Sequence, residues 1–167
     1  MSYSLQLYTL RNAIAEDLPG TIRKVADIGF TQVEPYNFVA TAKELGAALK
    51  ENGLTAPSGH APLLSQDQDD IFAAARELGI TTGNAAAKKG AGYGTRGGYH
   101  NHAWELESSI EGRTALEYFE SLLDPELVLE VDTYWVAVGG QDPVDILTKL
   151  GDRVKFVHIK RGNLTTD

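Results

Sequence analysis

The chain has 167 residues, of which 43% are hydrophobic, so it can bury the core of one domain. Its 23 acidic and 15 basic side chains give a formal net charge of −8, and an acidic surface repels nucleic acid. The absence of cysteine excludes disulfides and thiolate metal sites, and without a basic leader or a long apolar run we expect a cytoplasmic protein that does not span a membrane.

Helical segments that stop at a glycine alternate with short β-rich runs in the first half of the chain. Apolar residues recur at helical spacing in these segments, and Gly29, Gly53 and Gly79 follow them. We therefore expect helices over residues 17–28, 41–52 and 67–78. The β-rich runs predict strands over residues 4–9, 30–34, 54–60 and 80–82.

The second half of the chain continues the alternation. A segment rich in Ala and Lys predicts a weak helix over residues 84–93, and apolar residues at helical spacing predict a strong helix over residues 113–123. Asp142 as N-cap and Pro143 in the first turn predict a further helix that ends at Gly151. The remaining strands are expected over residues 96–102, 127–133 and 154–160.

Strands that alternate with helices in this way imply parallel β–α–β units, either in a doubly wound open sheet or in a (β/α)8 TIM barrel. The glycine spacing favours the barrel, because Gly53 follows Gly29 by 24 residues and Gly79 follows Gly53 by 26. Gly94 follows Gly79 by only 15 residues. We therefore expect a single α/β domain over residues 1–167, an incomplete TIM barrel with about seven strands, a shortened fourth unit and no eighth strand.

Polar side chains gather where the expected strands end, which is where TIM barrels place their functional residues. All four histidines of the chain lie at such ends, and this placement favours a shared polar pocket. The polar and aromatic residues at these ends are Gln6, Tyr8, Glu34, His60, His100, Asn101, His102, Glu105, Glu130, Asp132, Trp135, His158 and Lys160.

Imidazole and carboxylate groups without sulfur suit a divalent metal ion such as Mn²⁺, Mg²⁺, Co²⁺ or Zn²⁺. Such an ion binds adjacent sugar oxygens and acidifies the C–H bond next to a carbonyl, and a carboxylate can then move the proton. Asp132 lies inside the apolar run LEVDTYW, where an unpaired carboxylate is costly, so a metal ion or a hydrogen bond must satisfy it. His100 and His102 are two residues apart and therefore share one face of their strand.

Several segments resemble a known family. GYHNHAWELE, LEVDTYWV and VKFVHIK, in this order, are similar to strands five to seven of the sugar phosphate isomerase/epimerase family, the xylose isomerase-like TIM barrels. SLQLYTLR and VEPYN are similar to its first two strands. The resemblance covers most of the chain and implies a metal-dependent isomerase or epimerase for a small sugar, sugar phosphate or keto-sugar.

The resemblance also implies roles for individual residues. In the family, a Glu on strand five, an Asp on strand six, a His on strand seven and a Glu on strand eight hold the metal ion, and the two Glu side chains transfer protons. Asp132 and His158 match as metal ligands, and His100 stands at the strand-five Glu position as ligand and catalytic group. Glu34 is the other expected catalytic group. The residues expected to contact substrate are Tyr8, His60, His102, Trp135 and Lys160.

Three alternatives remain. A lyase or dehydratase for a keto-sugar would use the same residues, because it also begins by removing the proton next to the carbonyl. A truncated barrel without the strand-eight Glu would be inactive, and its open sheet edge would favour homo-oligomers. An open flavodoxin-like sheet would bind phosphate at its helix N-termini, and we rank it last because no glycine-rich phosphate loop follows the first expected strand.

Overall fold

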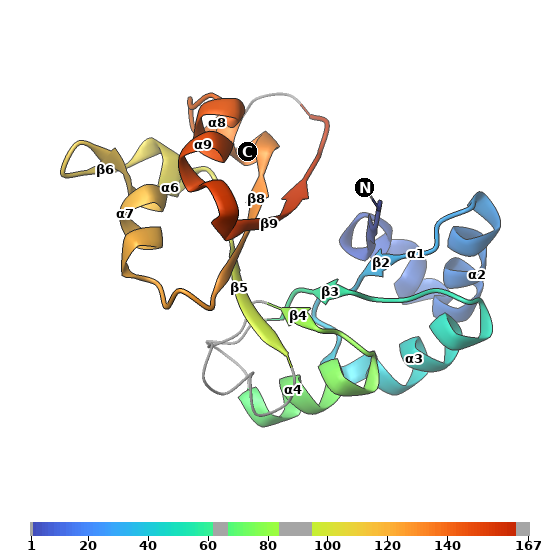
Figure 1. Ribbon diagram of the computed structural model, residues 1–167. Coiled ribbons are helices and arrows are strands. Elements are labelled where there is room, and N and C mark those ends of the chain that lie inside the picture. The colour runs from blue at the N-terminus through green and yellow to red at the C-terminus, as the bar shows by residue number, and fades with distance from the viewer. Residues whose placement is uncertain (1, 62–66, 84–94, 163–167) are drawn as a thin grey trace. The chain divides into compact units, whose positions relative to one another are not determined.

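The computed structural model describes residues 2–61, 67–83 and 95–162. They form two compact units, a first unit up to Gly97 and a second unit from Gly98 onwards (Figure 1). The weak helix expected over residues 84–93 lies outside the described residues. Within the described ranges, no helix combines the length and the apolar composition that crossing a membrane requires.

The first unit is built on short parallel strands. Their bounds are β1 Leu5–Gln6, β2 Val33–Glu34, β3 Ser58–Gly59, β4 Thr82–Gly83 and β5 Arg96–His100. β1 pairs with β2, β3 pairs with β4, and β4 pairs with the start of β5, in each case parallel. Isolated parallel bridges join Gln32 to Thr55 and Tyr36 to His60, so β2 and β3 are also neighbours. The strands of this unit therefore follow one another in chain order.

Helices cover one side of these strands. Their bounds are η1 Leu7–Leu10, α1 Arg11–Glu16, α2 Leu18–Ile28, η2 Val39–Thr41, α3 Ala42–Glu51 and α4 Gln68–Glu77. In Figure 1, α2, α3 and α4 lie along the same side of β2 to β4, with α2 against α3 and α3 against α4. The Asp17 side chain caps α2 by accepting a hydrogen bond from Gly20 N at 2.9 Å, and Gly29 ends the helix with a φ of 106°. The three helices expected in this part of the chain are confirmed.

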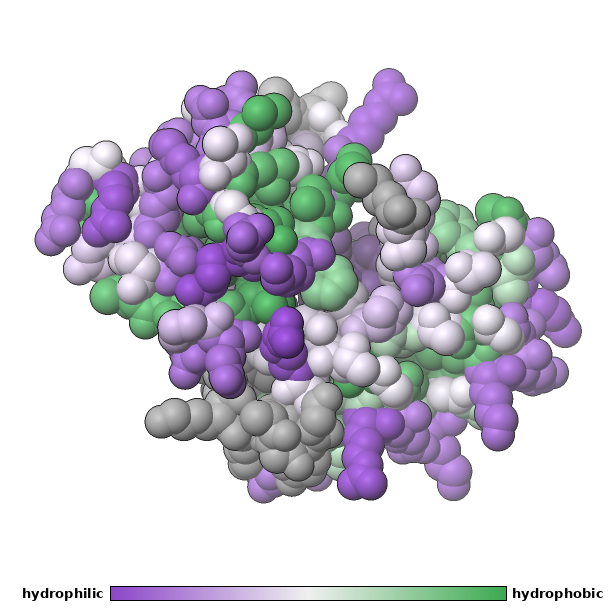
Figure 2. All heavy atoms as spheres, viewed as in Figure 1, coloured by the Kyte–Doolittle hydropathy of each residue, from purple (hydrophilic) through white to green (hydrophobic). Residues whose placement is uncertain are grey.

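The core of the first unit lies between these helices and the strands. It is formed by aliphatic residues that recur at helical spacing, together with Val33 from β2 and Phe38 beyond it. The helical members include Ile22, Val25, Leu45, Leu49, Ile71 and Ala75. The opposite faces of the helices are polar, and Figure 2 shows hydrophilic side chains along the border where Figure 1 places α2 and α3. The helices could be predicted from the sequence because each has apolar residues on one face alone.

The second unit repeats the arrangement with longer strands. The end of β5 pairs with β8 (Val128–Asp132), and β8 pairs with β9 (Val154–His158), both parallel. The helices are α6 Trp104–Glu107, α7 Ala115–Leu122, α8 Thr133–Val138, α9 Pro143–Leu150 and η3 Gly151–Arg153, and an antiparallel hairpin joins β6 Ser109–Ile110 to β7 Arg113–Thr114. Every residue of β8 is buried, as its apolar sequence predicted.

Side-chain caps fix the helix starts of the second unit. Thr114 and Glu117 form a reciprocal capping box at α7, and Asp142 accepts hydrogen bonds from two backbone N–H groups at the start of α9. Leu116 from α7 and Ile146 and Leu150 from α9 pack with the aliphatic residues of β8 into a second core. The helices expected over residues 113–123 and from Asp142 are therefore confirmed.

The described strands pair in the order of the chain, as in a barrel, whereas a doubly wound sheet reverses its strand order at a switch point. These described strands form partial sheets without the closure of a complete barrel. The expected strands are present but shorter, and the strand expected over residues 4–9 ends at Gln6 and continues as η1, which contains Tyr8. The chain also forms four short elements that its sequence did not predict, which are α1, α6, α8 and the β6–β7 hairpin.

Candidate functional site

The main cluster of polar side chains in the second unit lies at the C-terminal ends of its three parallel strands. His100 ends β5, Asp132 ends β8 and His158 ends β9. Asp132 and His158 are direct partners in the β8–β9 register. Because parallel strands end at the same edge of a sheet, this pairing brings the three side chains to one place.

The three side chains converge on a small volume. His100 Nε2 lies 3.2 Å from Asp132 Oδ2 and 3.0 Å from His158 Nδ1, and His158 Nδ1 lies 3.6 Å from Asp132 Oδ2. The Asp132 side chain is 0% exposed, His100 8% and His158 13%. The structure therefore brings together the three residues for which the sequence predicted a metal-binding role, and we call them the His–Asp–His cluster.

Local backbone structure fixes the orientation of Asp132. Its Oδ1 atom accepts hydrogen bonds from Tyr134 N and Trp135 N, both at 3.1 Å, so the carboxylate is the N-cap of α8. Its own backbone is held by the buried amide of Asn101, which accepts a hydrogen bond from Asp132 N at 2.8 Å and donates to Asp132 O at 3.4 Å. Oδ1 therefore binds the N-terminus of α8, and Oδ2 faces the two imidazoles.

A lysine approaches the same carboxylate oxygen. Lys160 Nζ lies 2.5 Å from Asp132 Oδ2 and 5.5 Å from the centre of the Trp135 ring. Burial by itself raises the pKa of a carboxyl group. The two imidazoles and the ammonium outweigh that effect, and they hold the pKa of Asp132 well below its ordinary value. Asp132 is therefore ionised at neutral pH and has the charge that a metal ligand needs.

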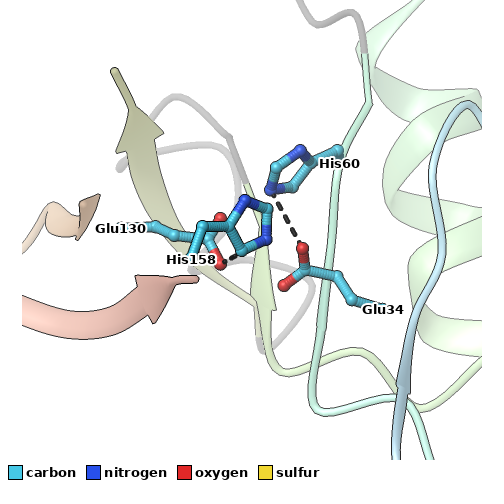
Figure 3. Close-up of side chains that lie close together, drawn as sticks. All are labelled: Glu34, His60, Glu130 and His158. Atoms are coloured by element: carbon cyan, nitrogen blue, oxygen red, sulfur yellow. Dashed lines mark ion pairs between the residues drawn. The ribbon is translucent and has the colours of Figure 1, made fainter. Parts of the chain in front are cut away.

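Glu130 contacts the far side of one imidazole. Its Oε1 atom lies 3.3 Å from His158 Nε2, an ion pair that Figure 3 marks with a dashed line. A carboxylate only accepts hydrogen bonds at neutral pH, so this contact favours the tautomer with the proton on Nε2. His158 Nδ1, which faces the cluster, then presents its lone pair. A carboxylate behind a histidine is the usual partner of a metal-ligating imidazole.

The rim of the second unit carries His102 and Trp135, whose ring centres are 6.3 Å apart. The buried Glu105 accepts hydrogen bonds from His102 N at 3.0 and 3.1 Å and a short hydrogen bond from the hydroxyl of Tyr99. Burial and then this carboxylate raise the pKa of Tyr99, so its hydroxyl stays a donor. Glu105 therefore holds the loop after β5, whereas sequence reasoning assigned it only a place at a strand end.

The first unit has a separate buried carboxylate at the end of β2. Glu34 Oε1 accepts a hydrogen bond from Gln6 Nε2 at 2.7 Å and lies 3.2 Å from His60 Nε2, the second pair dashed in Figure 3. Its other oxygen accepts a short hydrogen bond from Ser58 Oγ. Ser58 was not among the residues expected at the site, because a serine before a glycine in a strand has no distinctive signal.

Tyr8, the remaining residue expected at the substrate, also belongs to the first unit. It is 54% exposed, and its ring packs edge-on against Tyr36 with ring centres 5.1 Å apart. Its backbone N–H donates to the side chain of Gln6, which also reaches Glu34. The Gln6 side chain thus links Tyr8 to the Glu34–His60 pair, and the expected roles of Tyr8, Glu34 and His60 stay predictions.

The donor atoms of the second unit fit a divalent metal ion. Two imidazole nitrogens and one carboxylate oxygen lie within 4.8 Å of one another in the His–Asp–His cluster. Nitrogen and oxygen donors in this combination suit Mn²⁺, Co²⁺ and Zn²⁺ in particular, whereas Mg²⁺ prefers oxygen alone. The arrangement matches the Asp and His positions that the family resemblance implied, with His100 in place of a Glu.

Comparisons with known proteins support that resemblance. No family model matches the chain. A segment of 63 residues, 37% of the chain, is 38% identical to an inosose dehydratase from Geobacillus kaustophilus and spans only 20% of that protein. A sugar phosphate isomerase/epimerase structure from Parabacteroides distasonis superimposes with a TM-score of 0.79 at 22% identity, over 96% of this chain and 75% of that one.

A second solved structure is a xylose isomerase domain protein from Alicyclobacillus acidocaldarius. It superimposes with a TM-score of 0.58 at 16% identity and covers 90% of this chain and 71% of that one. Both structural neighbours are similar to the chain over nearly its whole length, and the order of its strands is that of a barrel. The chain therefore has the fold that these two proteins share, a TIM barrel in an incomplete form, as its strand motifs predicted.

Proposed function

We propose that this chain catalyses the metal-assisted isomerisation or epimerisation of a small sugar, sugar phosphate or keto-sugar, by moving a proton at the carbon next to a carbonyl. The observation that carries the proposal is the His–Asp–His cluster, because its donor atoms meet at the strand ends where this fold places its chemistry. The proposal treats residues 1–167 as one domain.

A divalent ion would be held by His100 Nε2, Asp132 Oδ2 and His158 Nδ1. Bound there, it would supply charge that polarises two neighbouring sugar oxygens and makes the adjacent C–H bond more acidic. Neighbouring side chains hold these donor atoms in the orientation and protonation state that metal binding requires. Glu130 keeps the proton of His158 on Nε2, and Asn101 holds the backbone of Asp132 in place.

Other side chains of the second unit are available to bind the substrate. Trp135 offers an aromatic face on which the apolar face of a sugar ring can pack, and His102 and Lys160 lie near it with groups that hydrogen-bond to hydroxyl or carbonyl oxygens. In the first unit, Glu34 is the proposed base, with His60 and Tyr8 as substrate contacts, on the strength of the family resemblance. A Glu that accepts a proton from one carbon and returns it to the neighbouring carbon gives isomerisation. Epimerisation needs a second acid on the opposite face of the carbon, and His100 is the proposed group for that role.

A dehydratase is the second candidate, and the sequence match to an inosose dehydratase favours it. It would share the first step, removal of the proton next to the carbonyl. The electron pair would then expel a hydroxyl group from the next carbon, and that hydroxyl leaves as water after taking up a proton. Isomerase and dehydratase therefore differ in the fate of one intermediate and not in the residues that form it.

Deuterium exchange tests the common step whichever product the enzyme forms. The Mn²⁺-loaded protein is incubated in D₂O with a panel of ketoses, aldoses, their phosphates and inosose, and mass spectrometry follows deuterium at carbon and any loss of water. We expect at least one compound to exchange, and Asp132→Asn and His158→Gln to abolish the exchange. Asp152→Asn, at an exposed position of η3, is the matched control. No exchange or water loss with any compound would contradict the proposal.

A further inference from the structure

The carboxylate of Asp132 has one oxygen to offer a metal ion. Oδ1 already accepts hydrogen bonds from two backbone N–H groups at the start of α8. Oδ2 faces the two imidazoles, and it is also the oxygen that Lys160 Nζ approaches to 2.5 Å. A metal ion and the lysine ammonium would therefore have to share the same oxygen.

The two cations cannot occupy that oxygen together without strong repulsion. A metal–carboxylate bond is about 2.0–2.2 Å long, so an ion on Oδ2 would stand within a few ångströms of the ammonium. The Asp132 side chain is 0% exposed, and water screens charges poorly at such a site. One of the two must withdraw.

Lys160 is the partner able to withdraw. Its side chain is 41% exposed, against 8% for His100 and 13% for His158. Its four-carbon stem turns freely, and its nitrogen is already 5.5 Å from the centre of the Trp135 ring, whose face attracts a cation. The ammonium can thus leave Oδ2 for solvent or for the aromatic face.

We propose that Lys160 is a built-in counter-ion of Asp132 that must be displaced before a divalent cation binds, so that this lysine sets the affinity of the metal site. The inference rests on the proposed function and deepens it, because it says how the same site is regulated. In the metal-free protein, Lys160 neutralises the buried carboxylate. In the metal-bound protein, the released ammonium lies beside Trp135, where it can bind a substrate oxygen.

Calorimetric titration of chelator-treated protein with MnCl₂ tests the inference. Lys160→Met keeps the apolar stem and removes the charge, and we expect it to bind Mn²⁺ at least about tenfold more tightly than the unchanged protein. Lys160→Arg keeps a cation and should bind Mn²⁺ as weakly as the unchanged protein, or more weakly. Lys155→Met removes an equivalent charge from an exposed position of β9 and should change nothing. Lys160→Gln serves the same comparison where Lys160→Met does not fold.

Thermal melting separates this role from a purely structural one. We expect Lys160→Met to lower the melting temperature of the metal-free protein, because Asp132 loses its counter-ion, and Mn²⁺ to raise it more than in the unchanged protein. If Lys160 only supported the fold, Lys160→Met would lower both the melting temperature and the Mn²⁺ affinity. Equal or weaker Mn²⁺ binding by Lys160→Met overturns this inference alone. Absence of Mn²⁺ binding by all variants overturns the proposed metal dependence as well.

Discussion

Each unit of the molecule buries one carboxylate at the end of a strand, but the two carboxylates have different partners. Glu34 in the first unit accepts hydrogen bonds from a neutral amide and a neutral hydroxyl and lies against His60. Asp132 in the second unit faces two imidazoles and an ammonium group. Both carboxylates therefore lie against an imidazole, and Asp132 has a second imidazole and an ammonium group beside it. We therefore expect the loss of Asp132 to weaken cation binding more than the loss of Glu34.

The largest expected effect comes from Asp132→Asn. Asparagine can still accept the two hydrogen bonds that cap α8, so the fold should survive, but the negative charge of the cluster is lost. We expect Mn²⁺ affinity to fall at least about 100-fold by calorimetric titration, because a charged first ligand is removed. Asp152→Asn should leave the affinity unchanged. If Asp132→Asn bound Mn²⁺ as the unchanged protein does, the distinction between the two carboxylates would be wrong.

Glu34→Gln is expected to give the opposite pattern. A proton-transfer group contributes about 10²–10⁴-fold to rate, so deuterium exchange into an active substrate should fall by that factor. Mn²⁺ affinity should stay within about threefold, because Glu34 is not one of the three ligands in the His–Asp–His cluster. Glu51→Gln, an exposed change at the end of α3, is the control for both measurements. A parallel loss of Mn²⁺ binding would show that Glu34 also serves the metal ion.

Helix caps test whether the two units behave as one domain. Asp17 caps α2 in the first unit and Thr114 caps α7 in the second. Replacing either by alanine should cost about 1 kcal/mol of the free energy of unfolding. In one cooperative domain, both changes lower the midpoint of the same calorimetric transition by similar amounts. Two transitions, each sensitive to one cap, would mean that the units unfold independently.

The smallest expected effect concerns pH and the second unit alone. Burial by itself would raise the pKa of Glu117, but Thr114 and Lys149 outweigh it and hold the pKa below 4.5. A lowered pKa gives stability that is present above the ordinary value and is lost as the pH falls through the folded-state pKa. Glu117→Gln should therefore flatten the decline of the urea midpoint below about pH 4.5. If the urea midpoint of Glu117→Gln fell with pH as in the unchanged protein, groups other than Glu117 would cause the loss of stability in acid.

Much of the fold was predictable because its helices have a strong periodic signal. The glycines after α2, α3 and α4 and the Asp–Pro start of α9 located those elements within a few residues. Short elements such as α6 and α8 were missed, since four to six residues carry too little periodicity. α8 starts because Asp132 turns one oxygen onto its N-terminus, a contact that depends on the strand before it.

The candidate site was predictable by type and by strand, but its contacts were not. The alternation of His100 and His102 and the position of Asp132 in an apolar strand placed them at one edge. The partners that hold them, such as Asn101 and Glu130, depend on the register between strands, which a single sequence does not specify. Lys160 was expected at the substrate, and its contact with Asp132 Oδ2 came only from the structure.

Asn101 grips the neighbouring strand end through the main chain, because its amide pairs with both the N–H and the C=O of residue 132. Any amino acid except proline has the same two backbone groups, so these two hydrogen bonds between the ends of β5 and β8 do not require a particular side chain at position 132. The alignment of β5 with β8 therefore does not depend on which side chain stands at position 132. A substitution of the ligand there should leave the two strand ends paired as before.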